Sequence, residues 1–299
     1  MLRTSCLFLC LFCLKTTVFA QDDLMDLLNQ ENVDSTSIIY AEATFKSSRV
    51  INGHSVELRS PGVLEFLISH RFGLISDGIG EFFGLDDSNI RFGLEFGVLN
   101  NLNVGIGRSS FEKQYDGFIK YRLLRQQTGF RSVPITAVFF TSMAINSSDA
   151  PPDQDWSFTN RTSYTYQLLL ARKFNPNFSA QLSPSLVHKN MVELAQDDND
   201  LYALGIGARH KLTKRLALNF EYYYMFNKPE GRGLHNSLSI GVDIETGGHV
   251  FQLHVTNSRA MIEKGFITET TSDFFDGDIH LGFNISRVFN IGKQKNTDW

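Results

Sequence analysis

Between residues 63 and 289 the chain alternates apolar and polar residues with a period of two. The clearest stretches are residues 90–98, 216–224 and 279–285, which carry Phe, Tyr, Leu, Ile or Val at every second position. This alternation predicts β-strands with one apolar and one polar face. A helical period is nearly absent after Gln30, so the chain is predicted to be all-β.

The pattern divides into about 12 strands, many of them about 10 residues long. Strands of soluble sandwiches are usually about 5–6 residues long, whereas membrane barrels need about 9–11 residues per strand. The apolar faces are rich in aromatic and branched side chains, as lipid requires, which explains the 26 Phe. The polar faces carry Gly, Ser, Asn, Gln and charges of both signs, which suits a polar lumen. We therefore predict a transmembrane antiparallel up-and-down β-barrel, and a soluble secreted all-β protein is the alternative.

The connections between strands support an even strand count. Outer-membrane barrels join their strands by short periplasmic turns and longer outer loops in alternation. Residues 110–114 are short for an outer loop, and residues 126–133 are long for an inner turn. The remaining links fit: short turns are expected at residues 100–101, 175–177, 211–214 and 246–248, and long links at residues 73–88, 143–157, 191–199, 227–234 and 257–275.

The composition averages the two faces and resembles that of a soluble protein. Hydrophobic residues make up 42%, charged residues 20%, and the mean hydropathy is −0.14. Without Arg3 and Lys15, which lie in the leader described next, the 28 Lys and Arg fall to 26, against 32 Asp and Glu. An acidic chain without a polybasic face predicts no nucleic-acid partner.

Residues 1–20 read as a cleaved signal peptide. Arg3 supplies the positive charge, residues 4–14 form an apolar core, and Ala20 is the small residue at the cleavage point. The apolar core is too short to span about 30 Å of hydrocarbon. All three Cys lie within residues 1–13, so the mature chain has none. Together with the predicted barrel, these features predict export to a bacterial outer membrane, where barrel-assembly machinery and lipid would be partners.

Residues 21–61 precede the barrel and carry a hairpin signal. Asn52-Gly53 is a strong type I′ turn sequence, with residues 45–51 and 54–59 on either side. These flanks are too polar for lipid, so we expect a hairpin inside the lumen or at the periplasmic mouth. Two additional strands, giving 14 in all, are the alternative. The barrel is expected over residues 62–289, followed by a tail over residues 290–299.

The chain resembles an uncharacterised family of predicted Gram-negative outer-membrane β-barrel proteins, a domain of unknown function. The resemblance implies the barrel and no reaction. It leaves open whether Phe289 or Trp299 is the C-terminal aromatic assembly signal. It is carried by residues 44–57 (TFKSSRVINGHSVE), 68–73 (ISHRFG), 105–110 (GIGRSS), 116–126 (DGFIKYRLLRQ), 184–190 (PSLVHKN), 239–253 (SIGVDIETGGHVFQL) and 277–289 (GDIHLGFNISRVF).

Several charged residues fall on the predicted lumen faces. Charges inside a narrow barrel must be paired, because an unpaired charge in a low dielectric is costly. Such a set indicates either a structural network that fills the lumen or a constriction that selects solutes by charge. Because both signs are present, neither anions nor cations are favoured. The set comprises Glu65, Arg71, Arg91, Glu95, Lys120, Arg122, Arg209, Glu221, Asp243, Glu245, His254 and His280.

His254 and His280 lie on adjacent predicted strands, with Asp243 and Glu245 on the strand before them. Their spacing matches no metal motif, so we predict no metal, no cofactor and no catalytic residues. The expected function is a narrow pore or transporter for a small solute. A closed scaffold of an envelope complex, with an unknown partner, and a membrane-surface enzyme are the alternatives.

Overall fold

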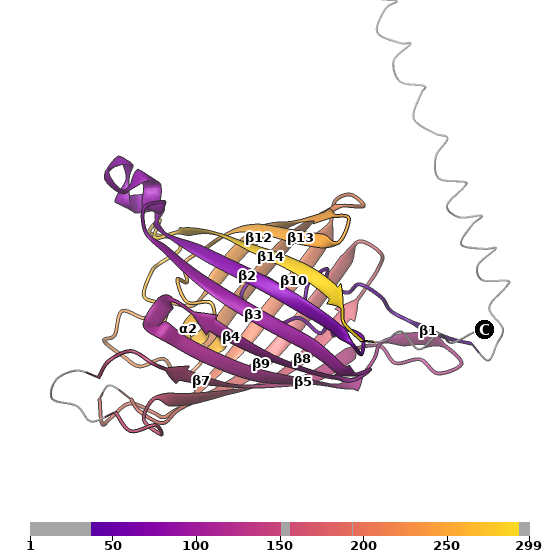
Figure 1. Ribbon diagram of the computed structural model, residues 1–299, viewed down its shortest axis with the longest axis horizontal. Coiled ribbons are helices and arrows are strands. Elements are labelled where there is room, and N and C mark those ends of the chain that lie inside the picture. The colour runs from indigo at the N-terminus through magenta and orange to yellow at the C-terminus, as the bar shows by residue number, and fades with distance from the viewer. Residues whose placement is uncertain (1–36, 151–155, 193, 293–299) are drawn as a thin grey trace, which may run out of the picture.

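The computed structural model describes residues 37–150, 156–192 and 194–292. Twelve antiparallel strands close into one barrel in the order β10-β11-β12-β13-β14-β2-β3-β4-β5-β7-β8-β9 (Figure 1). Each strand pairs with its neighbours along the chain, and β14 closes the ring on β2, with Ile285 opposite Ile68. The predicted up-and-down barrel of twelve strands is confirmed, and the alternative of fourteen is wrong.

The barrel strands are eight to twelve residues long. They are β2 (Val63–Leu74), β3 (Ser88–Leu99), β4 (Leu102–Ser109), β5 (Gln114–Leu124), β7 (Thr136–Asn146), β8 (Thr162–Lys173), β9 (Phe178–Lys189), β10 (Asp200–Lys211), β11 (Leu216–Met225), β12 (Leu238–Thr246), β13 (His249–Thr256) and β14 (His280–Asn290). The other elements are strands β1 (Ile38–Tyr40) and β6 (Gln127–Gly129), the 3-10 helices η1 (Ile75–Asp77), η2 (Ile79–Gly84) and η3 (Phe111–Lys113), and helix α2 (Glu263–Thr268).

The period-two pattern separates a lipid-facing surface from a polar interior. On β3, Arg91 and Glu95 are buried inside, whereas Phe92 and Leu94 are exposed outside. A large exposed apolar surface marks a membrane or partner contact. Here it continues around the ring, for example at Ile106, Ile119, Phe139, Tyr166, Leu182, Ile206, Phe220 and Leu253. Among the described residues, no helix is both long and apolar enough to cross a membrane.

The links follow the predicted alternation, and the long inner link has a structural reason. Residues 125–135 join β5 to β7 and contain β6, which pairs with β1 in a small sheet apart from the barrel. In Figure 1 this two-stranded ribbon extends from the short-turn end of the barrel. The link is therefore long because it contains β6, which pairs with β1, and β1 precedes the segment that enters the lumen.

Residues 44–59, which we call the plug, lie inside the barrel. Phe45, Val50 and Val56 of the plug pack against inward-facing apolar residues of β5, β7 and β8. Ten consecutive plug residues, 47–56, are buried, although they form no regular strand and only one bridge, between Arg49 and His54. Of the two predicted positions, the lumen is the one observed.

The predicted type I′ turn at Asn52-Gly53 does not form. That turn needs positive φ at both residues, and neither residue has it. Val50 N–H instead donates to Gly53 C=O at 2.8 Å, which makes Ile51 and Asn52 the central residues. The turn shifts by one residue because its backbone wraps a carboxylate of the barrel wall, described below.

Residues 257–279, which we call the inward loop, enter the lumen from the opposite end, and residues 257–270 are mostly buried there. They carry α2, on which Phe266 and Ile267 pack with Leu201 and Tyr223 of the wall. Figure 1 shows α2 within the outline of the barrel. Most of the long outer link predicted at residues 257–275 is thus a folded part of the interior, and its last residues, 271–275, are more exposed.

Some sequence predictions fall outside the described residues. These are the signal peptide at residues 1–20 and Trp299 in the tail. The last barrel strand ends at Asn290, one residue beyond Phe289.

Candidate functional site

The lumen wall binds the turn of the plug through one carboxylate. Glu221 on β11 accepts hydrogen bonds from the backbone N–H groups of Ile51, Asn52 and Gly53, at 3.1, 3.0 and 3.0 Å. Consecutive backbone amides around an anion form a nest, and bonds to a charged acceptor are stronger than neutral ones. Glu221 is therefore the main polar anchor of the turn.

Side-chain amides hold the rest of the turn. Asn284 Nδ2 donates to Ile51 C=O at 2.9 Å, and Gln252 Nε2 donates to Val50 C=O at 3.0 Å. Arg71 donates to Asn52 Oδ1 at 2.6 Å. Three wall strands thus share the turn, and its buried backbone groups are satisfied as burial requires.

The plug and the inward loop meet at a buried ion pair. Arg49 Nη1 lies 2.9 Å from Glu263 Oε1, and both side chains are almost fully buried. Burial raises the pKa of Glu263, while Arg49 opposes that rise. Burial, together with the charges of Arg49 and Lys120, holds the pKa of His54 well below its ordinary value. The imidazole is therefore neutral at pH 7, and its 3.6 Å approach to Glu263 is not an ion pair.

Three further lumen charges find partners on the wall or the plug. Arg91 binds Asp116 through two hydrogen bonds of 2.9 and 2.5 Å. Lys120 lies 3.6 Å from Glu95 and donates to a plug carbonyl at residue 57. Glu65 accepts from Arg59 at 3.0 Å. The structure thus brings five predicted residues, Glu65, Arg91, Glu95, Lys120 and Glu221, into a paired layer around the plug.

Other predicted residues lie at the edges of this layer. Asp243 accepts from Gln252 at 2.8 Å. Glu245 is more exposed and pairs with Lys46 of the chain entering the lumen. Arg209 reaches only Ala43 C=O at 3.5 Å, and Arg122 only Asn100 C=O at 3.4 Å. The last two arginines face the short-turn end without a carboxylate partner among the described residues.

The two histidines do not form a site together. His280 Nδ1 contacts Phe72 C=O at 2.9 Å, and both ring nitrogens of His254 are buried without a hydrogen-bond partner in the described chain. In the cross-strand register His254 faces Gly241 and Gly282. The described residues contain no group of three His, Cys, Asp or Glu side chains arranged to hold a metal ion.

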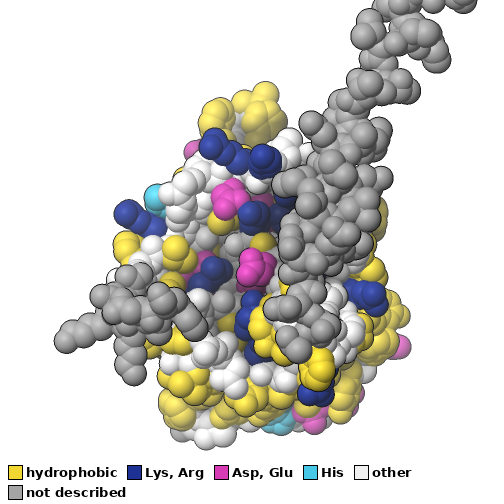
Figure 2. Space-filling model, turned by 90° about the vertical axis from the view of Figure 1, so that its right-hand side faces the viewer, with side chains coloured by type: hydrophobic (Ala, Val, Ile, Leu, Met, Phe, Trp, Pro, Cys, Tyr) yellow, Lys and Arg dark blue, Asp and Glu magenta, His cyan; other side chains and the backbone are white. Residues whose placement is uncertain are grey.

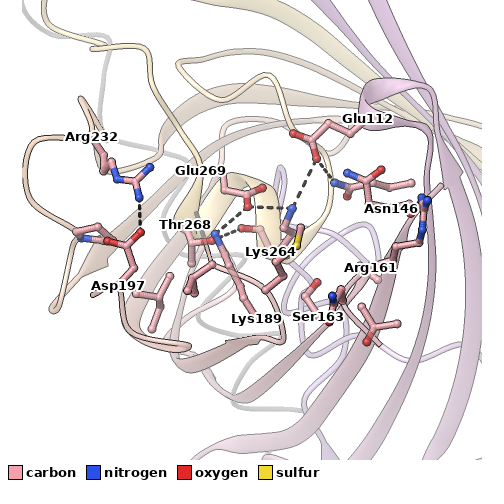
Figure 3. A pocket seen from close by; sticks show the side chains of 18 of the residues that line it. Glu112, Asn146, Arg161, Ser163, Lys189, Asp197, Arg232, Lys264, Thr268 and Glu269 are labelled. Carbon is pink, nitrogen blue, oxygen red and sulfur yellow. Dashed lines mark hydrogen bonds and ion pairs between the residues drawn. The ribbon is translucent and has the colours of Figure 1, made fainter. Parts of the chain in front are cut away.

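A large cavity opens above the inward loop, at the long-loop end. Its volume is about 990 Å³. Figure 3 shows a chain of ion pairs across it: Glu269 binds Lys189 at 2.7 Å and Lys264 at 2.9 Å, and Lys264 approaches Glu112 at 3.6 Å. We call this cavity the long-loop vestibule. Its cations and anions balance, so it favours neither anionic nor cationic solutes.

A second cavity, of about 620 Å³, lies below the plug at the short-turn end, and we call it the short-turn vestibule. Arg59, Arg122 and Arg125 line it, together with Glu42 and Glu57. Figure 2 views this end and shows Lys and Arg side chains over its central part, with Asp and Glu side chains among them. The two cavities share no lining residue, because the plug and the inward loop lie between them.

Sequence reasoning missed several residues of this layer. Asp116 stands two positions before Phe118 and four before Lys120 on one strand, so the alternation already placed it inside. Arg49 lay in the segment expected to be a hairpin, without an assigned role. Glu263 gave no signal, because it lies in a long link without periodicity.

These features define a membrane-bound β-barrel with a filled lumen. The family model described as "Membrane bound beta barrel domain (DUF5777)" matches residues 45–289, and the chain belongs to this family. No curated protein sequence matches the chain.

The solved structures that resemble the chain include outer-membrane proteins of low sequence identity. The KdgM porin is 10% identical, with 76% of this chain and 99% of that chain covered and a TM-score of 0.44. Outer membrane phospholipase A from Escherichia coli is 12% identical, with 81% and 98% covered and a TM-score of 0.44. The Acinetobacter baumannii outer membrane protein Omp33 is 7% identical, with 76% and 97% covered and a TM-score of 0.40. No activity of these proteins transfers to this chain at such similarity.

Proposed function

We propose that the protein is a gated outer-membrane pore for small hydrophilic solutes, described here in its closed conformation. The observation that carries the proposal is the kind of seal between the two vestibules. Beside two apolar clusters it contains many ion pairs and hydrogen bonds, such as Arg49 to Glu263 and Glu221 to the turn amides. The polar part of the seal separates under water at a lower cost than an apolar contact of the same size, because water replaces the lost hydrogen bonds.

The proposal includes the route to the membrane. We infer that residues 1–20 direct export and are removed, and that the barrel-assembly machinery of a Gram-negative bacterium inserts the mature chain. Mass spectrometry of the protein purified from outer membranes tests this, since it should give a chain that starts near Gln21. We assign no enzymatic reaction to the barrel.

Conductance across a planar lipid bilayer tests the pore. We expect the wild-type protein to show rare, brief openings, and the Arg49→Met variant to show frequent current steps. Removing one partner of a buried pair leaves the other charge uncompensated, which destabilises by about 3–5 kcal/mol and should shift the population toward the open state. Arg287→Met is the matched control, because Arg287 is exposed and stacks on Phe289 in the part of β14 at the short-turn end.

Heat-modifiable gel migration first establishes that each variant is a folded barrel. Folded variants that give no current above the lipid baseline, even after deletion of residues 44–59, would contradict the pore. That result favours the second candidate, a closed scaffold whose filled lumen serves only for stability. The deep burial of the whole paired layer is the observation that supports the scaffold.

A further inference from the structure

The lumen charges divide into a paired set and an unpaired set. Arg49, Arg91 and Lys120, deep in the barrel, each have a carboxylate within 4.0 Å. Four cations near the short-turn end have none among residues 37–150, 156–192 and 194–292: Arg122, Arg125, Lys173 and Arg209. Arg71, which is also deep, lacks such a carboxylate and donates to Asn52 and Asn284 instead. The mouth of the barrel therefore carries more cations without a close carboxylate than the deep layer does.

One carboxylate, that of Glu57, faces most of these cations. It lies within electrostatic reach of Arg59, Arg122, Lys173 and Arg209. Its Oε1 atom already accepts the N–H of Phe45 at 3.1 Å. Glu42 also lines the cavity, and Asp243 lies within electrostatic reach of Arg209. Three carboxylates thus face the four cations without a close partner, so the cavity keeps a small positive net charge.

Hydrogen-bond donors without an acceptor lie around the cavity at the short-turn end. Arg122 Nε and Arg59 Nη2 are buried and find no acceptor among the described residues. Arg125 has its guanidinium stacked over the ring of Tyr40 at 4.3 Å, which fixes its position while leaving its N–H groups to point elsewhere. Arg59, Arg122 and Arg125 all line the cavity of about 620 Å³. Three guanidinium groups around one cavity, two with buried free donors, suit a planar anionic group that accepts two bonds at once.

We propose that this cavity, lined by Arg59, Arg122 and Arg125, is a binding site for small organic carboxylates. Its volume falls in the range of about 300–1,000 Å³ typical of small-molecule sites. The long-loop vestibule carries balanced charges and offers no such preference. The binding site goes beyond the pore proposed above, because it binds its ligand whether or not the barrel conducts.

Two sources of carboxylate exist for this site. One is a free solute. The other is the chain itself, because residues 22–34 contain five acidic residues and precede β1, whose Tyr40 borders the cavity. The shared chemistry is the carboxylate, and the experiment separates the two sources.

Isothermal titration calorimetry of the detergent-solubilised full-length mature barrel with citrate tests the site, with glycerol as the uncharged comparison. We expect citrate to bind and glycerol not to bind. Citrate affinity should fall with rising salt. It should also fall at least about tenfold in Arg122→Gln, the loss expected for one charge-assisted hydrogen bond. Arg125→Gln should act similarly, and because Arg125 lies outside the strands it leaves the barrel wall intact.

The matched control is Arg215→Gln, which removes an exposed arginine from the turn between β10 and β11 at the same end. It should leave citrate affinity unchanged. A third variant replaces Asp22, Asp23, Asp26, Glu31 and Asp34 by their amides. Stronger citrate binding in that variant identifies the chain's own acidic residues as a competing occupant, and unchanged binding identifies a free solute. Equal citrate affinity in wild type, Arg122→Gln and Arg125→Gln, or no binding at low salt, overturns the site.

Discussion

The guanidinium of Arg49 lies 2.9 Å from the carboxylate of Glu263, although 214 residues separate them along the chain. Arg49 belongs to the plug, which enters from the short-turn end, and Glu263 opens α2 of the inward loop. The two parts that fill the lumen are therefore fastened to each other as well as to the wall. Loosening either one should loosen the other.

A double-mutant cycle measures this connection. Arg49→Met and Glu263→Gln should each lower the free energy of unfolding by about 3–5 kcal/mol, because each leaves a buried group without its partner. The double variant should lose clearly less than the sum of the single losses. Chemical unfolding in detergent gives the values, with Arg287→Met as the exposed control. Additive losses would show that the two residues do not act as a pair.

The carboxylate of Glu221 should control exchange of the turn amides. In Glu221→Gln the charged acceptor of three N–H groups becomes neutral, which costs about 1–3 kcal/mol. Amide hydrogens of Ile51, Asn52 and Gly53 should then exchange about 10- to 100-fold faster, while those of the barrel strands stay protected. Mass spectrometry of the peptide covering residues 44–59 measures the rates. Glu81→Gln, in an exposed helix of the loop after β2, should leave them unchanged.

Gly53 is required because the wall leaves no space for a side chain. A Cβ atom there would lie 2.1 Å from the Tyr223 hydroxyl oxygen and 3.2 Å from the ring carbon that bears it. Gly53→Ala should lower the melting temperature by several degrees, since overpacking costs about 1–3 kcal/mol. Tyr223→Phe should restore part of the loss by removing the clashing oxygen. Gly80→Ala is the control, because a Cβ at Gly80 meets nothing within 4 Å; an equal loss there would refute this account.

Two carboxylates of the inward loop should give opposite pH dependence. Burial would raise the pKa of Glu269, but Lys264 and Lys189 outweigh it and hold that pKa below its ordinary value. Its stabilising effect is therefore present above about pH 4.5 and is lost as the pH falls through the lowered pKa. The pKa of Glu263 is raised, chiefly by burial. Stability from this group therefore decreases as the pH rises from about 4.5 toward the raised value.

Unfolding measured between pH 3 and pH 8 tests both signs. Glu269→Gln should remove the loss of stability on the acid side. Glu263→Gln should remove the decline on the neutral side. Equal pH profiles for wild type and both variants would mean that neither carboxylate has a shifted pKa.

The barrel itself could be predicted because its signal is local. Each strand such as β3 repeats the same alternation, so the lumen positions of Arg91 and Glu95 follow from two-residue periodicity alone. Within β7, residues 137–140 (AVFF) are apolar at every position instead of alternating. Val138 and Phe140 face inward and pack on the plug, while Phe139 faces lipid, so both faces of this strand are apolar.

The pairing of the lumen charges could not be predicted, because it depends on contacts between distant segments. Glu221 appeared to be one more lumen charge, yet it sets the shape of the turn at residues 50–53. The type I′ prediction was wrong for this reason: three backbone amides pointing to one carboxylate outweigh the local preference of Asn-Gly. Glu263 could not be assigned at all, since it lies in a link without periodicity.

The plug enters and leaves the lumen by the same mouth. The chain comes in after β1, which pairs with β6 at the short-turn end, and returns to start β2 at that same end. The plug is thus a loop inserted into a ring, and among residues 37–150, 156–192 and 194–292 no segment passes through the ring from one end to the other. It can be withdrawn or reinserted without breaking any pairing of the twelve strands. The final topology is therefore the same whether the ring or the plug forms first.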